Sequence, residues 1–164
     1  MSRMKKIIYL FLLILTAVTG YYFYPEHQLS TGQKANKIVI YKSKHQLLLF
    51  DEGKQIASYK ISISKKGLAK KRKLGDNLTP EGTFKGFKRA NTKSSTYKYS
   101  KSIEVGYWGQ CCGVLIHGLS KKISWLRKFH RWSDRTEGCI RVTNDEFNEI
   151  FNAVDNGVII EIYP

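Results

Sequence analysis

The chain has 164 residues, enough for one domain with a hydrophobic core. Its content of 42% hydrophobic and 25% charged residues is ordinary for a globular protein, which argues against a disordered chain. The formal net charge of +15 predicts attraction to polyanions, but charge alone does not choose among nucleic acid, an acidic membrane and an anionic cell-wall polymer.

The N-terminal segment, residues 1–24, has the layout of an export signal. Arg3, Lys5 and Lys6 precede an apolar run that contains no acidic residue. Small residues near position 20 suit a cleavage site, whereas the aromatic continuation to Tyr24 brings the run to about the 18 residues at which a spanning helix becomes possible. We therefore expect a protein exported to the periplasm or cell envelope, with this segment as a signal peptide or a membrane anchor. Export argues against a nucleic-acid partner.

A folded domain is expected over residues 37–164, after a polar linker at residues 25–36. Short runs rich in β-branched and aromatic residues, separated by turn residues, predict an antiparallel meander at its start. Apolar and polar residues alternate from 58 to 63, as in a half-buried strand. His45 is expected on the surface, since no partner lies near it in the sequence. The three runs are residues 37–42, 45–50 and 56–63.

A strongly basic stretch follows at residues 65–73, with six positive charges and no negative one. It predicts a solvated loop, which either docks an anionic polymer or only keeps the domain soluble. Residues 79–82 then predict a turn into a strand at 83–88. Residues 91–103 show no helical face and predict an irregular loop over a cleft. Four aromatic residues in and after this loop either line a substrate groove or pack into the domain: Tyr97, Tyr99, Tyr107 and Trp108.

The chain has three cysteines, Cys111, Cys112 and Cys139. In an oxidising compartment an odd number leaves at least one thiol unpaired, or one that pairs between molecules. Cys111 and Cys112 form either a strained vicinal disulfide or, as we expect, two small residues entering a strand. No Cys-x-x-Cys or His-x-x-x-His spacing occurs, so we expect no metal, and we expect no cofactor.

The residue types that a cysteine nucleophile needs stand around Cys139. A reactive thiol requires a base, backbone N–H groups that hold an oxyanion, and a cation that orients an anionic substrate. The apolar run at residues 113–117 predicts a buried strand that ends in His117, which can act as the base. Gly138 allows a substrate to approach the backbone closely, and Arg141 can reach a carboxylate.

Residues 120–135, between the histidine and the cysteine, predict a helix that Ser120 could cap. Apolar side chains at three-residue spacing and two tryptophans share this segment with six basic residues. We interpret it as a basic, aromatic lid beside the thiol, which either selects an anionic or extended substrate or only packs with a solvated face. His130 is a second candidate for the base. The apolar and aromatic residues are Ile123, Leu126, Phe129, Trp125 and Trp132.

The C-terminal part predicts a helix followed by a strand. Residues 143–146 form a capping box, and apolar residues from 147 to 154 follow at the spacing of one buried helical face. A turn at residues 155–157 leads into a closing strand. We expect Asp145 and Glu146 to stabilise the start of the helix rather than to act as a catalytic pair.

Three motifs stand in a fixed order along the chain. Gly75-Asp76-Asn77-Leu78-Thr79-Pro80-Glu81-Gly82-Thr83-Phe84 comes first, then Ile116-His117-Gly118, then Thr136-Glu137-Gly138-Cys139-Ile140-Arg141. Together they resemble the active-site signature of the YkuD-type L,D-transpeptidases, enzymes of bacterial cell-wall peptidoglycan. Glu137 departs from the many relatives with a second histidine there. The resemblance implies a mainly β domain, a sandwich or curled sheet with one or two helices, here preceded by the apolar N-terminal helix.

The resemblance also implies a cysteine-dependent L,D-transpeptidase that binds a peptidoglycan stem peptide. The Cys139 thiolate would attack the carbonyl of the third, diamino-acid residue, D-Ala would leave, and a thioester would pass its acyl group to an amine. His117 would be the base, oriented by the carbonyl of Gly118, and carbapenems would acylate the thiol. The implied catalytic residues are Cys139, His117 and Gly118, and the implied oxyanion and substrate-binding residues are Gly138, Arg141 and Thr136.

Two other functions fit the same sequence. Water in place of the amine gives an L,D-carboxypeptidase, or a hydrolase that releases wall-linked protein. A non-catalytic basic module that binds the wall or nucleic acid is the second. In each case the expected partners include an anionic cell-wall or membrane surface, with possible membrane anchoring through residues 7–24.

Overall fold

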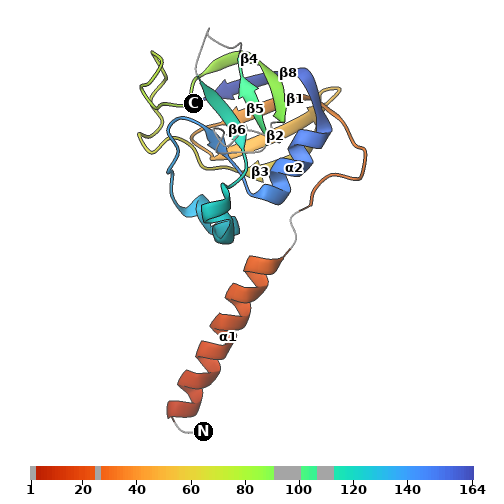
Figure 1. Ribbon diagram of the computed structural model, residues 1–164. Helices are drawn as coiled ribbons and strands as arrows, with labels where there is room; N and C mark the ends of the chain where they lie inside the picture. Colours follow the sequence, from red (N-terminus) through yellow and green to blue (C-terminus); the bar gives the residue numbers. More distant parts are fainter. Residues whose placement is uncertain (1–2, 25–26, 91–100, 107–112) are drawn as a thin grey trace.

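The structure is a computed structural model that describes residues 3–24, 27–90, 101–106 and 113–164. Helix α1 (Arg3–Phe23) projects from the folded domain (Figure 1). None of its 21 residues is buried, and within the described ranges it is the one helix that is long and apolar enough to cross a membrane. The expected apolar N-terminal helix is therefore present.

The described residues form one curled sheet of eight strands in the order β3-β2-β1-β8-β4-β5-β6-β7. Neighbouring strands are antiparallel except that β1 pairs with β8, and β6 with β7, in parallel. This confirms a mainly β domain and, of the two expected arrangements, the curled sheet. The strands are β1 (Ala35–Tyr41), β2 (Gln46–Asp51), β3 (Lys54–Lys60), β4 (Gly82–Ala90), β5 (Lys101–Val105), β6 (Val114–His117), β7 (Ile140–Arg141) and β8 (Val154–Tyr163).

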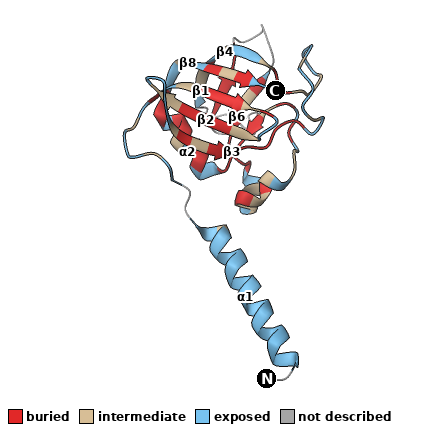
Figure 2. Cartoon of the chain, turned by 180° about the vertical axis from the view of Figure 1, so that it is seen from behind, coloured by how far each residue is buried: buried red, intermediate tan, exposed pale blue. Residues whose placement is uncertain are grey.

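The core lies on one side of this sheet, and buried residues run along its strands (Figure 2). Alternate residues of a strand point to the same face, so the regular spacing of aliphatic side chains in β1, β2 and β8 places them together. Each such side chain contributes about 1.5–3 kcal/mol by its burial. The expected meander of β1, β2 and β3 is confirmed. Its central core residues are Ile38, Ile40, Leu47, Leu49, Ile160 and Ile162.

Two helical segments lie in the C-terminal half, as expected. α2 (Asn144–Ala153) begins with the predicted capping box between Thr143 and Glu146. η1 (Lys121–Trp132) is a 3₁₀ helix, interrupted at Arg127, whose φ is +41°. Its apolar residues recur every three positions, a spacing that a helix with three residues per turn brings into line. Ser120 stands at the N-cap position, but its side chain makes no capping hydrogen bond, so that expectation is wrong.

Three boundaries differ from the sequence-based expectation. Residues 101–103 belong to β5 rather than to an irregular loop, because Ile103 is buried between β4 and β6. Ser62 is buried rather than exposed, because it faces the strand that carries Arg141. The expected turn at residues 155–157 is an irregularity inside β8, which already pairs with β1 at Val154.

Some expectations fall outside the described residues: those for Tyr97, Tyr99, Tyr107, Trp108, Cys111 and Cys112.

The expected linker is described from residue 27 onward, and this part contacts the domain. The backbone amides of Gln28 and Leu29 donate to Glu149 Oε1 at 2.9 and 2.7 Å. The polar segment before β1 therefore contacts α2 rather than standing clear of it.

Candidate active site

The parallel pairing of β6 and β7 brings the two C-terminal motifs together. Ile116 is paired with Ile140, and His117 with Arg141, although 24 residues separate the members of each pair. Cys139 directly precedes β7, so it lies beside the end of β6. Strand pairing thus places the histidine, the cysteine and the arginine of the expected site at one sheet edge.

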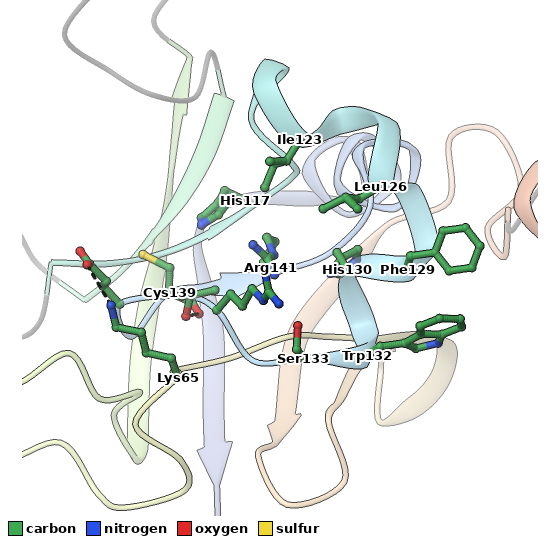
Figure 3. Close-up of a pocket in the computed structure, with 13 residues that line it drawn as sticks. Lys65, His117, Ile123, Leu126, Phe129, His130, Trp132, Ser133, Cys139 and Arg141 are labelled. Carbon is green, nitrogen blue, oxygen red and sulfur yellow. Dashed lines mark hydrogen bonds and ion pairs between the residues drawn. The ribbon is translucent and has the colours of Figure 1, made fainter.

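These three side chains line one cavity of about 840 Å³. In Figure 3 the side chains of Cys139, His117 and Arg141 lie next to one another at one side of the cavity. The other lining residues come from η1, from the segment that follows it, and from the basic loop: Ile123, Leu126, Phe129, His130, Trp132, Ser133, Arg135, Thr136, Glu137 and Lys65. The cavity therefore combines an apolar roof with a polar floor.

His117 is buried, and its ring is held by the next residue. Nδ1 lies 2.6 Å from the carbonyl oxygen of Gly118. A carbonyl can only accept, so Nδ1 carries the hydrogen, and Nε2 of the neutral ring is the basic nitrogen. The backbone carbonyl of His117 accepts from Val142 N at 3.1 Å, which ties the end of β6 to the residue after β7. This is the acceptor that the family resemblance implies.

The turn before Cys139 has little freedom. Gly138 has a φ of +101°, and an added Cβ would lie 2.7 Å from the carbonyl oxygen of Leu78. Thr79 Oγ1 donates to the Gly138 carbonyl at 3.0 Å, and Thr136 Oγ1 donates to the Cys139 carbonyl at 2.6 Å. The Cys139 N–H shares a peptide plane with the Gly138 carbonyl, so its direction is fixed as well. The Thr-Pro turn therefore borders the site, as expected.

Arg141 holds a positive charge at the wall of the cavity. Its side chain is buried, and Nη2 donates to Ser62 Oγ at 3.0 Å. Backbone bonds of 2.9 Å in both directions join the same two residues. Ser62 gives no signal of this role in the sequence, where it is one of several polar residues in an alternating strand.

The lid lies over the cavity as the sequence predicts. Ile123, Leu126 and Phe129 line the cavity from η1, although the Phe129 ring points away from Cys139 and His117 (Figure 3). His130, the second candidate base, is buried and lines the same cavity. Glu137, the departure from the family pattern, is exposed and lies 3.5 Å from Lys65 Nζ.

His45 has a partner, contrary to expectation. Its Nε2 lies 2.8 Å from Asp134 Oδ2, while Asp134 Oδ1 accepts from Ile63 N at 2.8 Å. This carboxylate joins the end of the lid to the meander. Sequence analysis missed it because 89 residues separate the histidine from the aspartate.

The basic loop at residues 65–73 is mostly solvated, but Asp76 organises its end. Partial burial would raise the pKa of Asp76. A hydrogen bond from Lys71 Nζ at 2.6 Å and bonds from three backbone amides outweigh that effect and hold the pKa below its ordinary value.

Among the described residues, no three His, Cys, Asp or Glu side chains gather as a metal ion would require.

Comparison with known proteins gives one family. A model of the YkuD family, the L,D-transpeptidase catalytic domain, matches residues 35–162. A comparison with curated proteins finds no significant match. The domain is similar in fold to an L,D-transpeptidase from Xylanimonas cellulosilytica, at 19% identity and a TM-score of 0.55 over 84% of this chain and 65% of that one.

Two further solved structures are similar. L,D-transpeptidase 1 from Mycobacterium tuberculosis is 19% identical, with a TM-score of 0.52 over 79% of this chain and 62% of that one. The helical cell shape determining protein from Campylobacter jejuni is 19% identical, with a TM-score of 0.58 over 80% of this chain and 47% of that one. This chain therefore spans about half to two thirds of the lengths of the three solved structures.

Proposed function

The chain belongs to the YkuD family of L,D-transpeptidase catalytic domains, and from this we propose that it is an exported, cysteine-dependent L,D-transpeptidase acting on peptidoglycan stem peptides. The observation that carries the proposal is the parallel pairing of β6 with β7, which sets His117 beside the turn that holds Cys139. We assign catalysis to residues 37–164, and export or anchoring to residues 1–24, with residues 25–36 between them.

The first step forms an acyl-enzyme. His117 Nε2 takes the proton of the Cys139 thiol, and the thiolate attacks the carbonyl carbon of the third residue of a tetrapeptide stem. The bond from that carbon to the nitrogen of D-Ala breaks, and the leaving amine takes the proton from Nε2. A thioester remains. The 2.6 Å bond from Nδ1 to the Gly118 carbonyl supports this role, because it leaves Nε2 to accept the proton.

The negative oxygen of the tetrahedral intermediate needs donors that are already in place. We assign this role to the backbone amides of Gly138 and Cys139. The fixed turn supports this assignment, because the hydroxyls of Thr79 and Thr136 donate to the carbonyls of Gly138 and Cys139. Thr136 is then a positioning residue, since its hydroxyl is engaged by the Cys139 carbonyl. Arg141, buried at the cavity wall, orients a substrate carboxylate.

In the second step an amine of another stem attacks the thioester carbonyl, and His117 takes the proton of the amine. The bond from the acyl carbon to the Cys139 sulfur then breaks, so the acyl group passes to nitrogen and the released thiolate regains a proton from His117. The cleaved peptide bond supplies the energy for the new bond, so no nucleotide is required. We propose that the apolar side chains of Ile123, Leu126 and Phe129, which line the cavity, favour an amine over water as the acceptor.

Product analysis tests this assignment. The full chain in detergent is incubated with isolated tetrapeptide muropeptides, beside Cys139→Ala, and the products are separated by liquid chromatography and mass spectrometry. Crosslinked dimers from the wild type alone support the transferase. Free tripeptides without dimers would assign an L,D-carboxypeptidase or hydrolase. Binding of wall polymer that is equal in both proteins, without any product, would contradict catalysis and leave a binding module.

A further inference from the structure

The C-terminal end of α1 is bound by a side chain from the lid. Lys128 of η1 is buried, and its Nζ donates to the backbone carbonyls of Tyr21 and Tyr24 at 2.9 and 2.6 Å. The last carbonyls of a helix have no partner within the helix, and its C-terminus carries a partial negative charge. Lys128 therefore caps α1 from a segment more than 100 residues away.

Aromatic packing extends the same contact. The Phe129 ring stacks on Tyr22 with ring centres 5.9 Å apart, and it also contacts Tyr21 at 6.1 Å. The Tyr22 hydroxyl donates to the Trp125 carbonyl at 2.6 Å. Figures 1 and 2 show, from opposite sides, that the lid lies between the end of α1 and the sheet. Phe129 also lines the cavity of the candidate site, so one side chain touches both α1 and the site.

The lid exposes tryptophan and lysine side chains, the residue types that are typical of a membrane interface. Trp125 is 66% exposed and Trp132 is 76% exposed, although both are large apolar side chains. Lys121 and Lys122 are exposed on the same segment. Tryptophan and tyrosine collect at the level of lipid headgroups, and lysine there attracts anionic lipid.

The dimensions of α1 place this surface at a bilayer. Its apolar part, residues 7–23, spans about 25 Å at 1.5 Å per residue, and its length is within the range of about 17–25 residues that cross a hydrocarbon core. The basic residues Arg3, Lys5 and Lys6 flank its N-terminal end, which orients that end to the cytoplasm. The end capped by Lys128 then emerges at the outer surface of the membrane.

We propose that α1 is retained as a membrane anchor, and that the lid rests on the anionic outer surface of the same bilayer. Trp125 and Trp132 enter the interface, and Lys121 and Lys122 contact lipid phosphates. The roof of the cavity is thereby held at the membrane surface. The proposal concerns position and stands independently of the reaction at Cys139.

Depth-dependent quenching tests the contact. The full chain is placed in vesicles of phosphatidylethanolamine and phosphatidylglycerol, with bromine on the acyl chains near the headgroup or near the bilayer centre. One variant keeps only Trp125 (Trp108→Phe with Trp132→Phe), and another keeps only Trp132 (Trp108→Phe with Trp125→Phe). We expect the shallow bromine to quench both tryptophans more than the deep bromine. Emission that is insensitive to bromine in both variants would overturn the proposal, even if the protein bound wall polymer.

Lys128→Met tests the cap, with Lys54→Met, an exposed lysine on β3, as the matched control. We expect hydrogen exchange in η1 to rise and quenching of both tryptophans to fall in Lys128→Met, and neither to change in Lys54→Met. Unchanged exchange and quenching in Lys128→Met would contradict the cap.

Retention of α1 is tested by the intact mass of wild-type protein isolated from membranes. We expect a mass that includes residues 1–24, and a mass that lacks them would contradict retention.

Discussion

Nδ1 of His117 lies 2.6 Å from the carbonyl oxygen of Gly118, the next residue in the chain. This contact fixes both the orientation and the tautomer of the imidazole, so that Nε2 is the nitrogen available to a proton from the thiol. We predict that ¹⁵N NMR of histidine-labelled protein shows one neutral ring protonated at Nδ1, whose signals disappear in His117→Gln. A ring protonated at Nε2 would contradict the assigned direction of proton transfer.

Gly138 is predicted to tolerate no side chain. Alanine there combines an unfavourable positive φ with a contact of 2.7 Å to the Leu78 carbonyl, and it displaces the turn that holds Cys139. We expect thiol acylation to slow by about 100-fold or more, the cost of a displacement of about 1 Å. Gly53→Ala is the control, because φ is +81° there but nothing lies within 4 Å of the added Cβ. It should cost about 1–2 kcal/mol of stability and leave the acylation rate unchanged.

The lid is predicted to depend on the pair Arg131–Glu146. Both side chains are almost fully buried, and Nη2 lies 2.5 Å from Oε1. Glu146→Gln removes the negative charge beside the buried Arg131 guanidinium, so we expect a loss of about 3 kcal/mol in the free energy of unfolding. Asp145→Asn is the control, since its pair with Arg127 is exposed and should contribute less than about 1 kcal/mol. Equal losses in urea unfolding of the two variants would contradict this account.

Asp76 is predicted to make stability depend on pH. Its pKa is lowered in the folded protein, so the carboxylate stabilises the fold above its unfolded pKa of about 3.9, and this contribution declines as the pH falls below that value. The difference in Tm between wild type and Asp76→Asn should therefore be constant from pH 8 to about pH 5 and shrink toward about pH 3. Asp155→Asn should give a smaller difference, since the Lys34 contact of Asp155 is exposed.

Local patterns were enough to predict most of the fold. The meander, the strand that ends in His117, and the capping box of α2 each depend on neighbouring residues, and each is confirmed. The start of β5 escaped prediction because residues 91–103 are rich in Ser, Thr, Lys and Tyr and were expected to form one irregular loop. In the fold Glu104 is buried beside Arg89 of β4, an ion pair that only strand pairing creates.

The candidate site also contains residues that the sequence predicts and residues that it does not. His117 and Cys139 stand in motifs whose spacing is readable, whereas the groups that position Arg141 and the lid are distant in sequence. Ser62 meets Arg141, and His45 meets Asp134, only after the meander packs against the C-terminal segment. The apolar spacing in the lid predicted a helix, but neither its 3₁₀ geometry nor its interruption at Arg127 was expected.

The most direct test of the account is the intact mass of the full chain after incubation with tetrapeptide stems and, separately, with a carbapenem. The account predicts a covalent adduct on the wild type and none on Cys139→Ala, with the adduct mapped to the peptide that contains Cys139. No gain of mass on a wild-type protein whose Cys139 thiol is verified as reduced would contradict the acyl-enzyme, and with it the proposed function.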